Sequence, residues 1–335
     1  MIQYSPEFDQ LNTEEQILLD KCVKSVEDFV KSSKKISGTS YATRDAHSKT
    51  YGVMQGTLDL EEDLPDFITT VLSEKTYDVI ARLSHANPVI SRSKKENPAF
   101  GFALKIKDIK GTEANFPLAN FPLFPTKSVS SFLKFFTSLN LFLVTKADNF
   151  VVSAMDLPSL MKHSAGFLPN FLSFDLAKNF AKILRRKDDF ILSFDFHSIG
   201  AYRIGDFLMK LKIVPHSPNP VFGATMDQRS RVENYFRLKD ATYDVIVEIC
   251  EDLKKQPIND LTKTWKDAPT YKIGTLHFKE NSLFDPEDQQ VENLNFNPFE
   301  NPESLLPVGK IQQIRKKVYD TSVATRNRLN ADQIL

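Results

Sequence analysis

The sequence predicts an α+β protein built on an antiparallel sheet or barrel. Three observations lead to this class: strand-like patterns fall into two groups, a helical stretch separates the groups, and a further helical pattern ends the chain. This arrangement is typical of folds whose helices are segregated from an antiparallel sheet. The length of 335 residues corresponds to roughly two average domains or one large one. Since no internal repeat or low-complexity linker interrupts it, we expect residues 1–335 to form a single domain.

The first elements are an amphipathic helix and three strands. Thr13 and Gln16 form a capping-box pattern, and apolar residues follow at helical spacing from Ile17 to Val30. We therefore expect a helix over about 13–35. The strand-like segments that follow lie around 51–60, 77–84 and 99–107.

The middle and the end of the chain repeat these signals. Helical patterns fill roughly 128–186, with expected breaks at Pro158 and Pro169. Strand patterns return afterwards, as in 242–251, where apolar residues alternate as a half-buried strand requires. The remaining expected elements are strand character over 190–214, a strand near 271–279, a proline-rich loop over 286–307, and a helix from about 309 to 330.

Composition excludes several classes of protein. Lys and Arg total 43 and Asp and Glu total 43, and this zero net charge argues against a protein that wraps nucleic acid. No apolar run approaches the ~20 residues that a membrane-spanning helix needs. The first residues lack the pattern of a secretory signal, so we expect a cytoplasmic protein. Cys22 and Cys250 are too few for a disulfide framework, and no glycine-rich phosphate-binding motif is present.

The last helix carries a candidate ligand for a metal ion. Arg315, Tyr319 and Arg326 are spaced i, i+4 and i+11, which places all three within about 40° on one helical face. Two guanidinium groups beside a phenol favour the phenolate, and tyrosinate is a known axial ligand of haem iron. A tyrosine that packs under arginine side chains on a solvated helix gives the same pattern.

A histidine provides a candidate acid/base group. His47 follows Arg44-Asp45-Ala46 and precedes an expected strand. Imidazole transfers protons well near neutral pH, since its ordinary pKa is about 6.5. A structural role for this histidine remains the alternative. The other five histidines show no metal-binding spacing.

An ordered set of short motifs resembles the haem catalase superfamily, and in particular its short catalase-related proteins. The resemblance covers about residues 37–330. The motifs are Arg44-x-x-His47, Ala81-Arg82-Leu83-Ser84, Gly101-Phe102-Ala103-Leu104-Lys105, Tyr202-Arg203-Ile204-Gly205-Asp206, Leu294-Asn295-Phe296-Asn297-Pro298-Phe299, Pro307-Val308-Gly309 and Arg315-x-x-x-Tyr319.

The resemblance implies a catalase-like antiparallel β-barrel with surrounding α-helices, a C-terminal haem-ligating helix and a haem b cofactor. It makes Tyr319 the ligand of the iron and Arg315 the support of its phenolate. It makes His47 the distal acid/base and Asn120 the distal asparagine that orients the peroxide. The residues around the porphyrin would be Phe132 against the ring and Arg44, Arg82 and Arg326 near the propionates.

The resemblance also implies a substrate, hydrogen peroxide or an organic hydroperoxide, together with a small-molecule reductant in the peroxidase case. Ala46 stands where catalases tend to have valine and allene oxide synthases have threonine. Its small side chain favours a peroxidase that accepts organic hydroperoxides. A true catalase, an allene-oxide-synthase-like isomerase and a non-enzymatic haem- or lipid-binding barrel stay open. The reductant and the oligomeric state, including a homo-oligomer, are also open.

Overall fold

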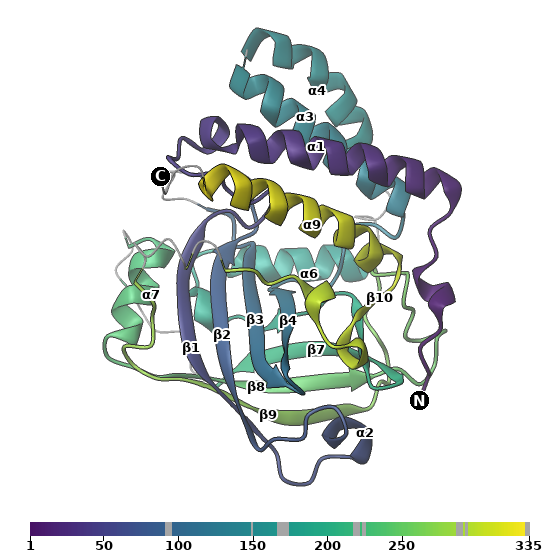
Figure 1. Cartoon of the computed structure of the whole chain (residues 1–335), viewed down its shortest axis with the longest axis vertical. Coiled ribbons are helices and arrows are strands. Elements are labelled where there is room, and N and C mark those ends of the chain that lie inside the picture. The colour runs from purple at the N-terminus through teal and green to yellow at the C-terminus, as the bar shows by residue number, and fades with distance from the viewer. Residues whose placement is uncertain are drawn as a thin grey trace.

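The computed structural model shows a closed antiparallel β-barrel with helices stacked along one side (Figure 1). It describes residues 1–90, 96–148, 150–165, 174–216, 222, 226–285, 291 and 294–331. Eight strands run in the order β7-β5-β4-β3-β2-β1-β9-β8, and pairing of β8 with β7 closes the ring. Closure leaves these strands without an unpaired edge. The α+β class and the barrel architecture are therefore confirmed.

The strands of the ring are β1 (Thr50–Leu60), β2 (Thr76–His85), β3 (Phe100–Ile109), β4 (Thr112–Ala119), β5 (Phe196–His197), β7 (Phe207–Pro215), β8 (Ala241–Ile249) and β9 (Thr270–Phe278). Two further strands, β6 (Ala201–Ile204) and β10 (Pro307–Val308), continue the sheet from β7. The segment expected as strand character over 190–214 is thus a short 3₁₀ helix (Ile191–Ser193) followed by three strands.

Aromatic side chains fill the barrel. Phe102 on β3 contacts three aromatic side chains from other strands of the barrel, which are Phe196 on β5, Tyr243 on β8 and Phe278 on β9. All four side chains are fully buried. Side chains alternate between the two faces of a strand. Gly101 and Ala103, the neighbours of Phe102, therefore face outward.

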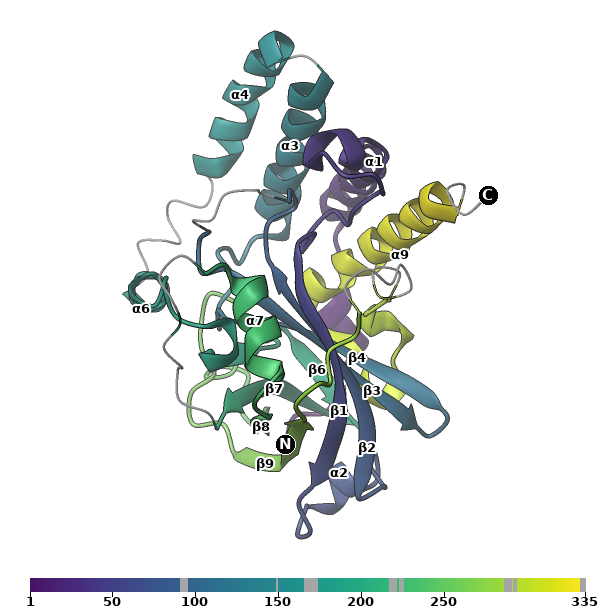
Figure 2. The same ribbon diagram turned by 90° about the vertical axis from the view of Figure 1, so that its left-hand side faces the viewer.

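The described part of the chain has seven helices outside the barrel. They are α1 (Thr13–Ser37), α2 (Asp66–Thr69), α3 (Val129–Asp148), α4 (Phe150–Ala165), α6 (Phe174–Arg185), α7 (Gln228–Phe236) and α9 (Lys310–Ala331). Helix α1 packs on both α3 and α9, and the three helices share an apolar cluster that includes Val26, Leu133 and Ile314. Helix α9 lies between α1 and the barrel (Figure 1). In Figure 2, α4 and α6 lie on the side of the molecule away from α9.

Two details of the helices differ from the sequence-based expectations. The first helix is capped by Asn12 and Glu15, which exchange side-chain and backbone hydrogen bonds of 2.8 Å, and not by Thr13 and Gln16. Asparagine is as good a cap as threonine, so the capping pattern fits either register. The expected break at Pro158 is wrong, because α4 continues through it while packing on α3. Pro169 lies outside the described residues.

Both cysteines are free and buried, so neither forms a disulfide. In the part of the chain that the structure describes, no helix has both the length and the apolar character needed to cross a membrane.

Candidate functional site

A cavity of about 330 Å³ lies between the outer face of the barrel and helices α1, α3 and α9. This volume is at the lower end of the range for small-molecule sites. Its walls combine apolar side chains with a few charged ones. Seven of the eight residues predicted from the sequence line it: Arg44, His47, Arg82, Phe132, Arg315, Tyr319 and Arg326.

His47 lies on the barrel wall of the cavity, where β3 has no side chain to obstruct it. A Cβ atom at Gly101 would lie 2.4 Å from Nδ1 of His47, so only glycine permits this approach. The backbone of His47 has φ = 54°, a left-handed conformation in which histidine is more common than most residues. Loop and strand together therefore hold the imidazole in one position.

Polar contacts fix both the ring and the backbone of His47. Nδ1 lies 3.1 Å from Oγ of Ser84, which leaves Nε2 as the ring nitrogen without that contact. Arg82 donates a 2.7 Å hydrogen bond to the His47 carbonyl and a 2.8 Å bond to Oγ1 of Thr50. Arg82 is thus a support of the histidine.

The pKa of His47 is lowered to about 3. Burial is the main cause, because it disfavours the imidazolium, and the nearby charges of Arg82 and Arg315 act in the same direction. The imidazole is therefore neutral at neutral pH.

The helix wall of the cavity carries Tyr319. Arg315, one turn earlier on α9, donates a 3.0 Å hydrogen bond to the phenolic oxygen and also contacts Gln312. Burial opposes the charge of Arg315, yet its pKa is raised, since the hydroxyl groups of Tyr319 and Tyr202 favour the guanidinium. The i, i+4 spacing predicted from the sequence thus brings the cation and the phenol together.

Arg326, the third residue of that helical face, belongs to a different group. It is buried in the cavity wall near Asp45, whose carboxylate accepts a 2.6 Å hydrogen bond from Ser322. Burial raises the pKa of Asp45, and the hydrogen bond from Ser322 and the charge of Arg326 oppose this effect. Asp45 precedes His47 by two residues in the sequence.

The remaining lining residues give the cavity its shape. Phe132 on α3 stacks on Phe136 at 5.6 Å with an interplanar angle of 13°, and its edge meets Phe124. Arg44 donates a 2.9 Å hydrogen bond to the carbonyl of Leu294. The cavity is therefore an apolar slot with arginine side chains along it.

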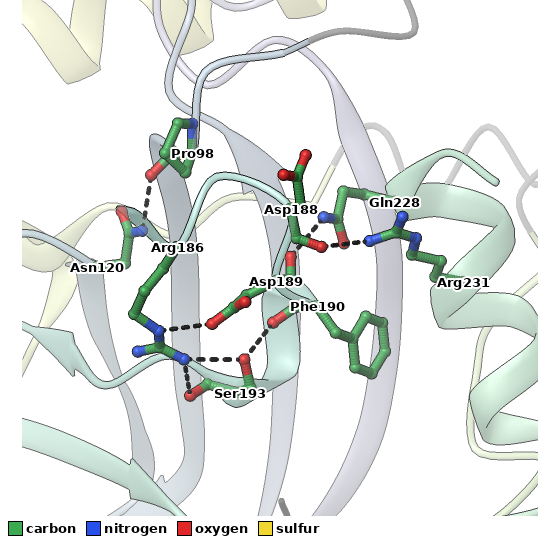
Figure 3. A network of polar contacts seen from close by, with 9 residues as sticks. All are labelled: Pro98, Asn120, Arg186, Asp188, Asp189, Phe190, Ser193, Gln228 and Arg231. Atoms are coloured by element: carbon green, nitrogen blue, oxygen red, sulfur yellow. Dashed lines mark hydrogen bonds and ion pairs between the residues drawn. The ribbon is translucent and has the colours of Figure 1, made fainter. Parts of the chain in front are cut away.

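Asn120 is not part of this cavity. Its amide nitrogen donates to the carbonyl of Pro98 (Figure 3), and its amide oxygen accepts from the backbone N–H of Phe100. Both hydrogen bonds tie β4 to the start of β3. The β4 residues that line the cavity are Pro117, Leu118 and Ala119. Both polar atoms of the Asn120 amide are thus hydrogen-bonded to the backbone, and Asn120 is the one predicted site residue that lies outside the described lining of the cavity.

Sequence reasoning missed four residues that shape the site. Ser84 and Gly101 occur in the quoted motifs, but their contacts with His47 depend on the pairing of β2 with β3. Gln312 precedes Arg315 by one helical turn, a spacing that could have identified it. Nothing in the sequence around Asp45 indicates that its carboxyl group is buried.

The chain forms a closed antiparallel barrel, and its C-terminal helix, which carries Tyr319, packs outside this barrel. This is the catalase fold. A fungal catalase superposes with a TM-score of 0.60 and 15% identity over 87% of this chain. Catalase A from Saccharomyces cerevisiae gives 0.59 and 16% over 86%, and a bacterial catalase gives 0.60 and 15% over 87%.

The chain spans about 60% of the length of these catalases. No known family profile and no curated protein sequence matches it. The likeness is therefore one of fold.

Proposed function

We propose that the chain binds haem b in this cavity and acts on peroxides, with a preference for organic hydroperoxides over hydrogen peroxide. The observation that carries the proposal is the placement of Tyr319 and His47 on two facing walls of one cavity. Between them lies an apolar slot that includes Phe132. The fold of the catalases supports the same assignment.

The residues present fit a haem group. The phenolic oxygen of Tyr319 accepts a hydrogen bond from Arg315, and on losing its proton to bound ferric iron it would become the hard anionic ligand that this ion accepts. Aromatic and aliphatic side chains suit the faces of a porphyrin. Arg44, Arg82 and Arg326 suit its carboxylates, since guanidinium pairs well with carboxylate groups.

When bound, haem supplies the electrons that break the O–O bond. His47 moves the proton. Its neutral imidazole accepts a proton from the oxygen of the peroxide that it faces and returns it to the departing oxygen, which leaves as water or an alcohol. Transfer by a positioned side chain contributes typically 10²–10⁴ in rate. A pKa near 3 makes the protonated ring short-lived, so the proton passes on readily.

The preference for organic hydroperoxides rests on the barrel wall of the cavity. Ala46, Ala103, Pro117 and Ala119 line it, and no side-chain amide stands beside His47 among the described lining residues of β4. Small apolar side chains accommodate the carbon skeleton of a hydroperoxide. They offer no hydrogen bond to the second oxygen of hydrogen peroxide.

The test compares two substrates on haem-loaded protein. We expect cumene hydroperoxide to be reduced, with a phenolic dye as the reductant, at a kcat/KM at least tenfold above that for hydrogen peroxide, and with little oxygen release. His47→Asn should slow both reactions by at least ~10²-fold, because asparagine keeps the left-handed backbone but lacks the base. Fast oxygen release from hydrogen peroxide would identify a true catalase. Haem binding without turnover would identify a binding protein.

A further inference from the structure

Five of the nine most exposed large apolar side chains in the described residues belong to three helices: Leu141 on α3, Leu157 and Met161 on α4, and Phe180 and Leu184 on α6. Met161 is 64% exposed and Phe180 45%. Single exposed apolar side chains are common on proteins, but a concentration of them on neighbouring segments of the chain is a candidate interaction surface.

Helix α6 is amphipathic, and part of its apolar side is exposed to solvent. Ala177, Phe180, Ala181 and Leu184 are all exposed and fall on one face at spacings of three and four residues. Leu176 is buried and Phe180 touches Phe121, and these contacts dock the helix on the body. The exposed apolar stripe therefore belongs to a helix that is packed on the rest of the protein.

Basic residues border this stripe. Lys178, Lys182 and Arg185 are exposed, again at spacings of four and three, whereas Asp175 is the only acidic residue of α6. The whole chain has zero net charge, so this helix is a local concentration of positive charge. Within the described residues, Lys182 and Arg185 take part in none of the ion pairs.

Arg186, the residue after α6, has a different role. Its guanidinium binds Asp189 at 2.7 Å and the carbonyl and hydroxyl of Ser193 at 2.9 and 3.0 Å, which ties the end of the helix to the short 3₁₀ helix that precedes β5 (Figure 3). The anchored end and the exposed cations are thus separate features.

We propose that α6, together with the exposed face of α4, binds the surface of an anionic lipid bilayer. Both helices lie on the same side of the molecule, away from α9 (Figure 2). An interfacial helix places Phe and Leu side chains among the lipid headgroups while Lys and Arg on its polar side reach the lipid phosphates. Leu157, Met161 and Lys162 of α4 add the same combination.

Charge selects the bilayer over a second copy of this chain. A symmetric dimer through α6 would bring one set of cations against an identical set, and like charges at close range disfavour association. An anionic surface complements them. Each basic residue near such a surface strengthens binding roughly fivefold.

The test is sedimentation of the purified full chain with vesicles. We expect binding to phosphatidylcholine vesicles that contain 30% phosphatidylglycerol, and little binding to pure phosphatidylcholine. Reversal of Lys178, Lys182 and Arg185 to Glu should weaken binding by at least ~10²-fold. Leu184→Glu and Met161→Glu should each weaken it at least tenfold.

The matched control is Leu238→Glu combined with Lys239→Glu, since both side chains are exposed but follow α7 on another part of the surface. This double variant should bind as the parent does. Equal binding to neutral vesicles, an equal loss in the control, or no binding to anionic vesicles would overturn the proposal. A dimer in solution that Leu184→Glu dissociates, without vesicle binding, would overturn it in favour of a second copy.

Discussion

Replacing His47 should make the protein less sensitive to acid. The histidine has a pKa of about 3 in the folded chain and about 6.5 when unfolded. The unfolded chain therefore binds a proton there as the pH falls below 6.5, while the folded chain does not. This difference removes stability progressively as the pH falls from 6.5 toward 3.

The size of the effect follows from the two pKa values. Between pH 7 and pH 5 the unfolded form of His47 gains about 2 kcal/mol relative to the folded form. Any folded pKa below 4 gives nearly the same figure, because the folded imidazole is then still neutral at pH 5.

The assay is urea unfolding of the parent and of His47→Asn at pH 7 and pH 5. The variant should lose about 2 kcal/mol less than the parent between the two pH values. His197, which also has a pKa lowered by burial, to about 4, is present in both proteins and cancels. An identical loss in the parent and in His47→Asn would refute the assigned burial of this imidazole.

Three other substitutions test the neighbourhood of His47. Gly101→Ala should displace the imidazole of His47, since the added Cβ would lie 2.4 Å from Nδ1. We expect peroxide turnover to fall at least tenfold and the free energy of unfolding in urea to fall by roughly 1–3 kcal/mol. Asp45→Asn should raise the thermal stability of the protein at pH 8 but not at pH 4. Burial raises the pKa of the Asp45 carboxyl, so ionisation of this group destabilises the folded state as the pH rises. The amide oxygen of the asparagine can still accept the hydrogen bond from Ser322. Ala46→Val should reduce kcat/KM for cumene hydroperoxide at least fivefold more than for hydrogen peroxide, and equal effects on both substrates would show that this position does not select between them.

Much of the barrel was predictable because its strands alternate regularly. In β8 the side chains of Tyr243, Val245, Val247 and Ile249 are buried in turn, as the pattern indicated. Strand β4 was missed, since Thr112–Ala119 contains Pro117 and only a weak alternation. Its place is determined by pairing with β3, which local sequence does not encode.

The site was predictable where one element determines it and unpredictable where several meet. The turn of α9 that joins Arg315 to Tyr319 follows from helical spacing alone. The position of Asn120 outside the cavity lining could not be predicted, because neighbours in the sequence do not reveal which side chains at the end of β4 meet the cavity. The burial of Asp45 depends on Ser322, 277 positions away in the chain, and no local signal reports such a contact.

The most direct measurement of the central claim is the absorption and resonance Raman spectrum of the purified protein loaded with ferric haem, for the parent, Tyr319→Phe and Tyr271→Phe. We predict one haem per chain and an iron–phenolate vibration in the parent and in Tyr271→Phe, the control on β9. Tyr319→Phe should lose that vibration and most of its haem affinity. An unchanged spectrum and affinity in Tyr319→Phe would contradict the assignment of this tyrosine as the iron ligand.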